Sequence, residues 1–477
     1  MSESIKKNYL YSLGYQILNI IVPVFTIPYI SRIFGAEGLG IYSYTSSIAQ
    51  YFVLFALLGL NNYGTRAIAI VRDDFSKLNK TFSEIFAMQV VTGTLAVLFY
   101  YLYIVLSSDA NNYQLYFLIL SIQLISAIFD VNWYFFGREK FQLTVIRNSV
   151  VKLSTLIAIF ALVHSPEDLW LYLFIHVLSI FISAIVLWPA ILKEVKLVRV
   201  SFRDVVYHFK PNLIMFIPVI AISVYKYMDK IMLGCYSITE TGYYENVEKI
   251  LSVSLGLITA LGTVMLPRMS NLVAKKEEGT AVRYITKSME FAMFLSIALA
   301  CGMFAIAPEF VPIYFGKGFE RCIVILQMLV VSAIITSWAN VIRTQYLIPF
   351  KRDNIYVYSV IAGALTNFGL NIIFIRLYGA IGAVIGTISA ESIVAIIQTH
   401  AARGKLECRK MVAKTLPYFA IGIIMIFSVR LCSALNLNIY AKLVLEIIVG
   451  ALVYIGLSLL YKIKTNKDEL LAFKISH

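Results

Sequence analysis

Six charged side chains interrupt two of the most apolar stretches of the sequence. They are Lys226, Asp229 and Lys230 in the run "YKYMDKIMLG", and Glu245, Glu248 and Lys249 in the run "GYYENVEKILSVSLG". The members of each triad are spaced i, i+3 and i+4, which places them on one face of a helix. Such clusters can bind a charged ligand, take up a proton or a cation, or pair internally.

The positions of the two triads predict that they lie at a similar depth in a helical hairpin. Lys226 precedes the turn "CYSITETG" by about as many residues as Lys249 follows it. The three carboxylates, Asp229, Glu245 and Glu248, are therefore candidates for coupling to a proton or a sodium ion. The alternative is a structural network that holds the two helices together, because Glu245 and Lys249 already form an i, i+4 pair.

The composition predicts that these helices lie in a membrane. Hydrophobic residues make up 60% of the 477 residues, charged residues only 14%, and the mean hydropathy is +0.79. No soluble core needs that much apolar surface, whereas runs of about 20 apolar residues are typical of transmembrane helices. An ionisable side chain at the centre of a bilayer costs roughly 3 kcal/mol, so it usually faces a cavity or a partner.

The apolar runs predict an all-α polytopic membrane protein with about 14 transmembrane helices. The connections between the runs are short, which leaves no room for a soluble catalytic domain on either side. The predicted spans are 10–33, 41–66, 82–106, 113–136, 146–163, 169–192, 211–234, 243–267, 285–313, 322–348, 355–376, 380–402, 415–433 and 439–461.

Lysine and arginine are distributed unevenly among the connections. Most of the 41 basic residues lie at the N-terminus, in every second loop and in the C-terminal tail. Because cytoplasmic loops carry an excess of Lys and Arg, both termini are predicted to be cytoplasmic in a multi-pass protein of a bacterial plasma membrane. The net charge of +14 then reflects this topology and attraction to anionic lipids, and no nucleic acid is needed to explain it. The dispersed cysteines and histidines predict no metal site and no cofactor.

An internal repeat relates the two halves of the chain. The segment "GIYSYTSSI" at 40–48 aligns with "GYYENVEKI" at 242–250, and the same offset carries Arg66 onto Arg268. Six spans separate the copies, so two six-helix bundles related by a pseudo-two-fold axis along the membrane normal are expected. The predicted domains are an N-terminal six-helix lobe at 1–200, a C-terminal six-helix lobe at 201–404, and two additional transmembrane helices with a cytoplasmic tail at 405–477.

Prolines fall inside repeat-related spans. Pro23 and Pro28 lie in the first span and Pro218 lies in the seventh. Proline removes a backbone hydrogen bond and permits bending. We therefore expect these two spans to bend during function, with a static kink as the alternative.

Several of these segments resemble one known family. The opening "NIIVPVFTIPYISRIFGAEGLGIYSYTSSIAQYF" and the following "LGLNNYGTRAIA" are similar to the start of the polysaccharide transporter, or Wzx-type, flippases. The segments "KPNLIMFIP", "YMDKIMLG" and "LPRMS" are similar to the start of their second half, and "NWYFFGREKF" is a further similarity. The resemblance extends over essentially the whole chain. That family belongs to the multidrug/oligosaccharidyl-lipid/polysaccharide exporter superfamily.

The resemblance implies a function and a mechanism. It implies two bundles that flank a central cavity and open alternately to each side of the membrane. It also implies movement of undecaprenyl-pyrophosphate-linked oligosaccharide repeat units from the cytoplasmic to the outer leaflet, for synthesis of capsule, O-antigen or exopolysaccharide. A polysaccharide polymerase is a candidate partner, besides the membrane lipids.

Five basic residues are candidates for binding such an anionic substrate. They are Arg32, Arg66, Lys226, Lys249 and Arg268. Arginine binds phosphate bidentately, which suits a pyrophosphate. Arg66 and Arg268 lie at the predicted cytoplasmic ends of the second and eighth spans, where the alternative is anchoring at the membrane surface. Topology demands no cation at Arg32, at the outer end of the first span.

The leading prediction is a transporter and not an enzyme. The sequence has no GxxxxGK[ST] motif, so ion coupling, membrane potential or consumption of the product must drive it. A multidrug or cation exporter of the same superfamily is an alternative, but it would favour a mainly anionic cavity. A lipid II flippase is another, because that branch also keeps two extra helices after the repeat. A membrane enzyme of polysaccharide assembly would need catalytic groups gathered on sizeable loops, and the outer loops here are short.

Overall fold

The computed structural model describes the backbone of residues 2–475, and the side chains of residues 18–465 apart from 20, 109, 141, 257 and 263. This part of the chain is helical and contains no strand. It includes 13 helical stretches that are long and apolar enough to cross a membrane. The prediction of an all-α polytopic membrane protein is confirmed.

One of the 13 stretches accounts for two predicted spans. Ile21–Val71 contains 51 residues, and its backbone leaves the helical conformation at Gly35, where φ is 62°. A straight helix of that length would measure roughly 75 Å, more than twice the ~30 Å hydrocarbon core of a bilayer. Glycine reaches positive φ without strain, so Gly35 is where the chain turns back.

The chain divides into two compact units, Met1–Gly242 and Tyr243–His477. The predicted lobes at 1–200 and 201–404, the two additional helices at 405–477 and the pseudo-two-fold relation between the lobes remain predictions. The helices of the first unit are α1 (Ser2–Leu57), α2 (Leu60–Val71), α3 (Phe75–Leu106), α4 (Ser108–Asn112), α5 (Gln114–Ile128), α6 (Asn132–Gly137), α7 (Phe141–Leu162), α8 (Leu169–Ile185), α9 (Trp188–Glu194), α10 (Phe202–Ser223) and α11 (Asp229–Tyr236).

Local sequence signals fix where helices of the first unit begin. At the start of α3, Oδ1 of Asp74 accepts the backbone N–H groups of Ser76 and Lys77, each at 3.1 Å. These bonds and the Lys77 ammonium hold the pKa of Asp74 below its ordinary value. At the start of α10, Ser201 and Asp204 form a reciprocal capping box.

A buried polar and aromatic core lies inside the first unit. Trp133 of α6 stacks on Phe82 of α3 with ring centroids 5.3 Å apart. The Trp133 indole N–H donates to Oε1 of Gln89 at 3.0 Å, while Nε2 of Gln89 donates to the carbonyls of Ala127 at 2.7 Å and Asp130 at 2.8 Å. Gln89 therefore satisfies the backbone where α5 ends, which a purely apolar side chain could not do.

The second unit is built around α13. Its helices are α12 (Ile238–Ala274), whose first residues belong to the first unit, α13 (Glu278–Phe315), α14 (Arg321–Ile342), α15 (Asp353–Tyr378), α16 (Ala380–Ala402), α17 (Cys408–Cys432) and α18 (Ile439–Ile475). The two helices that follow the predicted repeat pack on α13 through polar contacts. Tyr418 of α17 donates to Oε1 of Glu290 at 3.1 Å, and Tyr454 of α18 donates to the Phe294 carbonyl at 2.8 Å.

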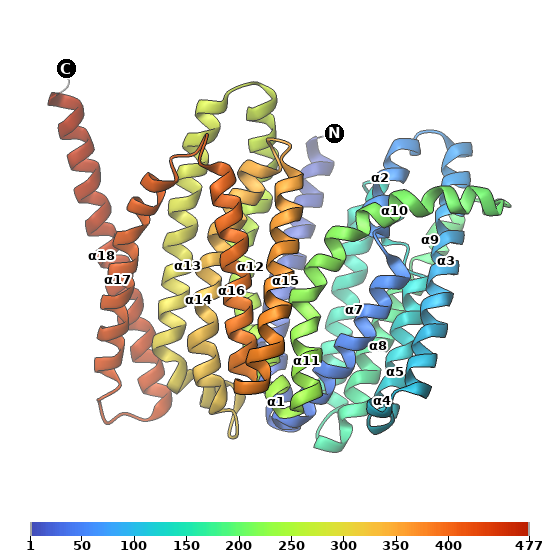
Figure 1. The fold of residues 1–477 in the computed structure, drawn as a ribbon, viewed down its shortest axis with the longest axis horizontal. Coiled ribbons are helices and arrows are strands. Elements are labelled where there is room, and N and C mark those ends of the chain that lie inside the picture. The colour runs from blue at the N-terminus through green and yellow to red at the C-terminus, as the bar shows by residue number, and fades with distance from the viewer. Residues whose placement is uncertain (1, 476–477) are drawn as a thin grey trace. The chain divides into compact units, whose positions relative to one another are not determined.

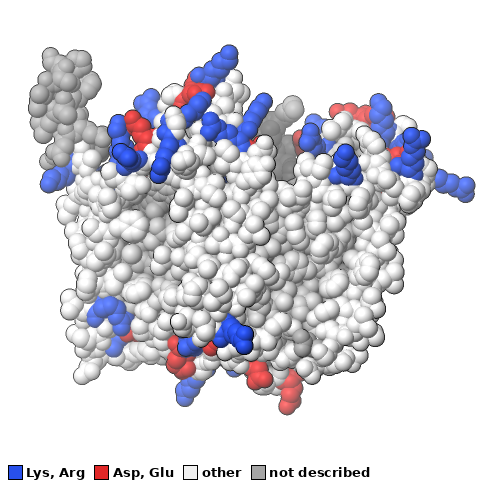
Figure 2. Space-filling model, in the orientation of Figure 1, with Lys and Arg blue, Asp and Glu red and all other residues white. Residues whose placement is uncertain are grey.

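The surface of each unit matches a protein that spans a bilayer. Figure 2 shows Lys, Arg, Asp and Glu gathered near the two ends of the helices, with a broad uncharged band between them. Large apolar side chains are exposed on the spanning helices, including Phe99 on α3 and Phe427 on α17. In water such a surface would be unstable, whereas lipid chains cover it without cost.

Candidate functional site

The first charged triad lies where α10 passes into α11. The connecting segment η2 (Val224–Met228) is a π-helix, whose wider turn changes the angular spacing of side chains. Asp229 is completely buried and Lys230 is buried, whereas Lys226 is exposed, with its ammonium 5.4 Å from the Tyr227 ring centroid. The regular helical spacing predicts that Lys226 shares one helix face with Asp229 and Lys230. In the structure, Lys226 does not share their buried position.

The second triad lies on the first part of α12. Glu245 is buried, and its Oε1 lies 2.9 Å from Nζ of Lys249, which confirms the pair predicted from the i, i+4 spacing. Glu248 and Lys249 are half-buried. The two triads lie on either side of the division at Gly242, so their opposition across a hairpin stays a prediction.

The three candidate arginines are all exposed. Arg32 lies on α1, three residues before the break at Gly35. Arg66 lies on α2 and makes no ion pair or hydrogen bond with any other residue in the described part of the chain. Arg268 donates to the Tyr284 hydroxyl, and its guanidinium carbon lies 4.1 Å from the centroid of that ring. Since tyrosine is neutral, this contact holds Arg268 in place without compensating its charge.

One intramembrane cation was missed by the sequence reasoning. Lys152 lies half-buried near the middle of α7, and its ammonium lies 2.5 Å from Oδ1 of Asn19 on α1. It forms no salt bridge with any carboxylate whose side chain is described. The signal was present in the sequence as a single lysine within the apolar run "VVKLSTLIAIF".

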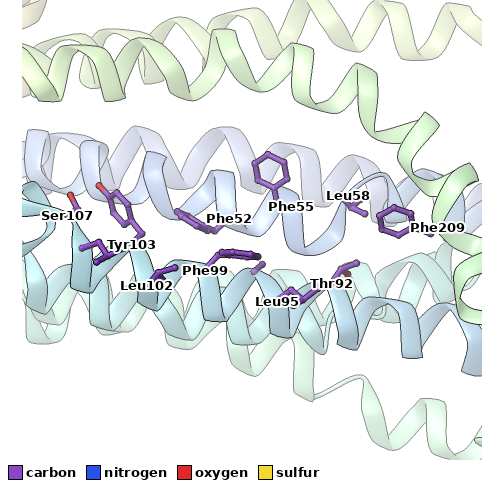
Figure 3. A pocket seen from close by; sticks show the side chains of 12 residues that line it. Phe52, Phe55, Leu58, Thr92, Leu95, Phe99, Leu102, Tyr103, Ser107 and Phe209 are labelled. Atoms are coloured by element: carbon purple, nitrogen blue, oxygen red, sulfur yellow. The ribbon is translucent and has the colours of Figure 1, made fainter. Parts of the chain in front are cut away.

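An apolar groove of about 770 Å³ lies in the first unit between α1, α3 and α10. Figure 3 shows aromatic rings from all three helices around it, including Phe52 and Phe55 of α1, Phe99 of α3 and Phe209 of α10. The lining includes none of the charged candidates, so this groove accepts hydrocarbon and not a charged headgroup.

The described residues contain no group of three His, Cys, Asp or Glu side chains that could hold a metal ion. The site candidates are instead basic side chains near the helix ends and carboxylates inside spans. Helices that cross the membrane and carry buried charges define a multi-pass transporter fold.

Residues 5–273, more than half of the chain, match the model of a family described as polysaccharide biosynthesis protein. The chain belongs to this family, which confirms the resemblance seen in the sequence.

Curated relatives cover most of the chain. A protein of Shigella dysenteriae named "Putative O-antigen transporter" is 25% identical over 402 residues, which are 83% of this chain and 100% of the relative. A protein of Escherichia coli (strain K12) with the same name is 23% identical over 395 residues, which are 82% of this chain and 95% of the relative. A "Probable low-salt glycan biosynthesis flippase" of Haloferax volcanii is 23% identical over 246 residues, about half of each chain.

Solved structures share the fold. A lipid II flippase in an inward closed conformation matches with a TM-score of 0.77 and 16% identity. The match covers 96% of this chain and 99% of the flippase chain. An inward-facing multidrug resistance transporter matches with a TM-score of 0.55 and 14% identity, covering 83% and 98%. At these identities the likeness shows the fold alone.

Proposed function

We propose that the protein is a flippase that moves a polyprenyl-pyrophosphate-linked oligosaccharide from the cytoplasmic to the outer leaflet of a bacterial plasma membrane. The observation that carries the proposal is the similarity to the two O-antigen transporter relatives, which extends over 100% and 95% of their lengths. The protein acts as a transporter and not as an enzyme, and it works by alternating access. Its product is a substrate for surface polysaccharide assembly, with a polymerase as the proposed partner.

The anionic headgroup is bound by basic side chains, two of which have no charged partner among the described residues. Arg66 has no partner among the described residues, and the hydrogen-bond partner of Arg268 is a neutral tyrosine. A pyrophosphate would supply the missing negative charge, and guanidinium groups suit its geometry. Arg32, Lys226 and Lys249 complete the proposed set on their charge alone, and Lys249 is paired with Glu245 in this conformation.

Asp229, Glu245 and Glu248 are the proposed coupling groups for a proton or a sodium ion. Asp229 is the strongest of the three, because its carboxyl is completely buried within a transmembrane helix, where uptake of a proton or a cation would offset its charge. Glu245 already has the Lys249 ammonium at 2.9 Å, which reduces its need for another cation. Both termini are proposed to lie in the cytoplasm, on the side that the loop charges favour.

The test is the leaflet distribution of lipid-linked oligosaccharide in a deletion strain. We expect the repeat units to accumulate in the cytoplasmic leaflet, and plasmid-borne wild-type protein to restore export. Normal surface polysaccharide with no such accumulation would refute the flippase function. A block in peptidoglycan synthesis with normal surface polysaccharide would point to lipid II as the substrate.

The site residues are tested at equal protein levels in the membrane. Arg66→Ala is expected to reduce export severely, and Arg66→Lys partly, since lysine keeps the charge but not the bidentate geometry. Arg199→Ala is the matched control, because Arg199 is an exposed arginine of the same unit without a described partner. Equal export by Arg66→Ala and Arg199→Ala would discard the assignment of Arg66.

A further inference from the structure

A chain of three titratable side chains, separate from the charged transport candidates, connects α10 to α2 and α3. Nε2 of His208 on α10 lies 2.8 Å from Oε2 of Glu84 on α3, and its Nδ1 lies 2.6 Å from Oη of Tyr63 on α2. His208 is 5% exposed and Glu84 is 8% exposed. Because water hardly reaches the imidazole and the carboxylate, their hydrogen bonds are stronger than the same bonds on a surface.

Few other charges face this imidazole. Behind the carboxylate, Nζ of Lys80 on α3 lies 3.6 Å from Oε1 of Glu84. On α10 itself, the Tyr207 ring lies 5.4 Å from the imidazole centroid, and Asp204 lies one turn earlier, where its carboxylate accepts from Ser201. The charged group in direct contact with the ring is thus the Glu84 carboxylate, and the Lys80 ammonium lies on its far side.

One proton reverses a hydrogen bond in this chain. When His208 is neutral, its Nε2–H donates to Glu84 and its Nδ1 accepts from the Tyr63 hydroxyl. When His208 is protonated, both ring nitrogens donate, so Tyr63 becomes the acceptor and the bond to Glu84 becomes a charge-assisted ion pair. The attachment of α10 is therefore stronger with the proton bound.

The rest of α10 is able to bend above this attachment. Pro211 and Pro218 lie inside the helix and each removes a backbone hydrogen bond, and the π-helical η2 follows before Asp229. Figure 1 shows α10 following a curved path before it reaches α11. His208 precedes both prolines, so the chain of three fixes only the initial segment of the helix.

We propose that Tyr63, Glu84 and His208 form a proton-binding site that fixes residues 202–210 of α10 to α2 and α3, and that loss of the proton loosens this segment. The site lies on the helix that leads to Asp229. Whether the proton is bound therefore determines how firmly the start of α10 is held while the rest of the helix bends. This inference concerns a second proton site and does not depend on which sugar is transported.

The test is hydrogen–deuterium exchange of the purified full-length protein in lipid nanodiscs. Exchange of peptides that cover residues 202–212 is followed across about pH 5 to 8, where histidine changes charge, and is corrected for the intrinsic pH dependence of amide exchange. We expect the exchange rate of this segment to change in one step with pH and to be roughly tenfold slower on the acidic side. The reason is that a charge-assisted hydrogen bond stabilises the closed segment over its open form by about that factor more than a neutral hydrogen bond does.

Three variants make the outcome specific. His208→Gln keeps a donor toward Glu84 but cannot titrate, and we expect the step to vanish. Glu84→Gln replaces the charged acceptor of the imidazole with a neutral amide, so no ion pair can form, and we expect the step to become smaller. Tyr51→Phe is the control, because Tyr51 also bonds to α10, at the Ser223 carbonyl at 3.3 Å, without a titratable partner.

Two results would overturn the proposal. One is a wild-type protein whose segment 202–212 shows no step, and the other is a step that persists in His208→Gln or keeps its full size in Glu84→Gln. Because the measurement reads backbone exchange and not transport, either result leaves the proposed flippase function intact.

Discussion

Two glycines allow α1 to cross the turn between α11 and α12 at backbone contact. A Cβ atom on Gly40 would lie 1.9 Å from the carbonyl oxygen of Ile238, and one on Gly242 would lie 1.8 Å from that of Ala36. Real Cβ atoms essentially never approach closer than 3.0 Å. A Gly40→Ala substitution therefore forces the two backbones apart by about 1 Å, in a region where interiors tolerate little overpacking.

The substitution destabilises only those conformations of the protein in which α1 crosses the turn between α11 and α12 at backbone contact. Overpacking of this kind destabilises by about 1 to 3 kcal/mol, which changes a conformational equilibrium by roughly 5- to 150-fold. If alternating access makes and breaks the crossing, Gly40→Ala shifts the protein away from this conformation. We expect thermal stability in detergent to fall and export of surface polysaccharide to drop at least about fivefold.

The assay compares variants at matched membrane levels. Gly256→Ala on α12 is the control, because no described atom lies within 4 Å of its added methyl group. Gly234→Ala meets the Tyr44 ring at 2.0 Å, so Tyr44→Ala should rescue it. Gly40→Ala meets a backbone oxygen, so Ile238→Ala should not rescue it. The reasoning fails if Gly40→Ala behaves like Gly256→Ala, or if Ile238→Ala restores it.

Three further substitutions test the packing and the coupling. Arg430→Met removes the cation that lies 2.8 Å from the buried Glu309 carboxylate and 4.0 Å from the completely buried Glu446 carboxyl, and should cost roughly 3 kcal/mol; adding Glu446→Gln removes one of the two carboxylates and should recover part of the thermal stability, and no recovery would contradict the pairing. Gln89→Leu should lower thermal stability by roughly 1 to 3 kcal/mol, because it leaves the Trp133 indole N–H and two backbone carbonyls without their hydrogen bonds, and an unchanged melting temperature would contradict this role. Asp229→Asn should reach the membrane normally but export poorly, with no response to an imposed ion gradient; a gradient-dependent Asp229→Asn protein would move the coupling group elsewhere.

The spans and the local pair were predictable because their signals are local. Apolar runs of the length of a bilayer located the transmembrane helices, and the i, i+4 spacing identified Glu245 and Lys249. The exposure of Lys226 was not predictable, because it follows from a π-helical turn that depends on how α10 is held.

The contacts that join distant helices could not be read from one sequence. His208 is separated by 124 residues from Glu84 and by 145 from Tyr63, so no periodicity connects them. Lys152 was detectable by the same rule that found the triads, but its partner Asn19 lies 133 residues away. Charge in an apolar span therefore reveals that a partner is needed, and only the fold identifies it.

The partners divide the membrane charges into two classes with opposite expected behaviour. Lys249 and Arg430 have carboxylates at 2.9 and 2.8 Å, so the fold itself compensates their charge in this conformation, and Lys249 would bind a substrate only after releasing Glu245. Arg66 has no described partner and Lys152 has a neutral amide, so no described carboxylate compensates either side chain. We propose that an anion that arrives with the substrate supplies this negative charge, whereas simple anchoring of Arg66 at the membrane surface would leave export unchanged when the residue is neutralised. Neutralising Arg66 or Lys152 should therefore lower export while leaving thermal stability unchanged or raised, whereas neutralising Arg430 should lower stability first.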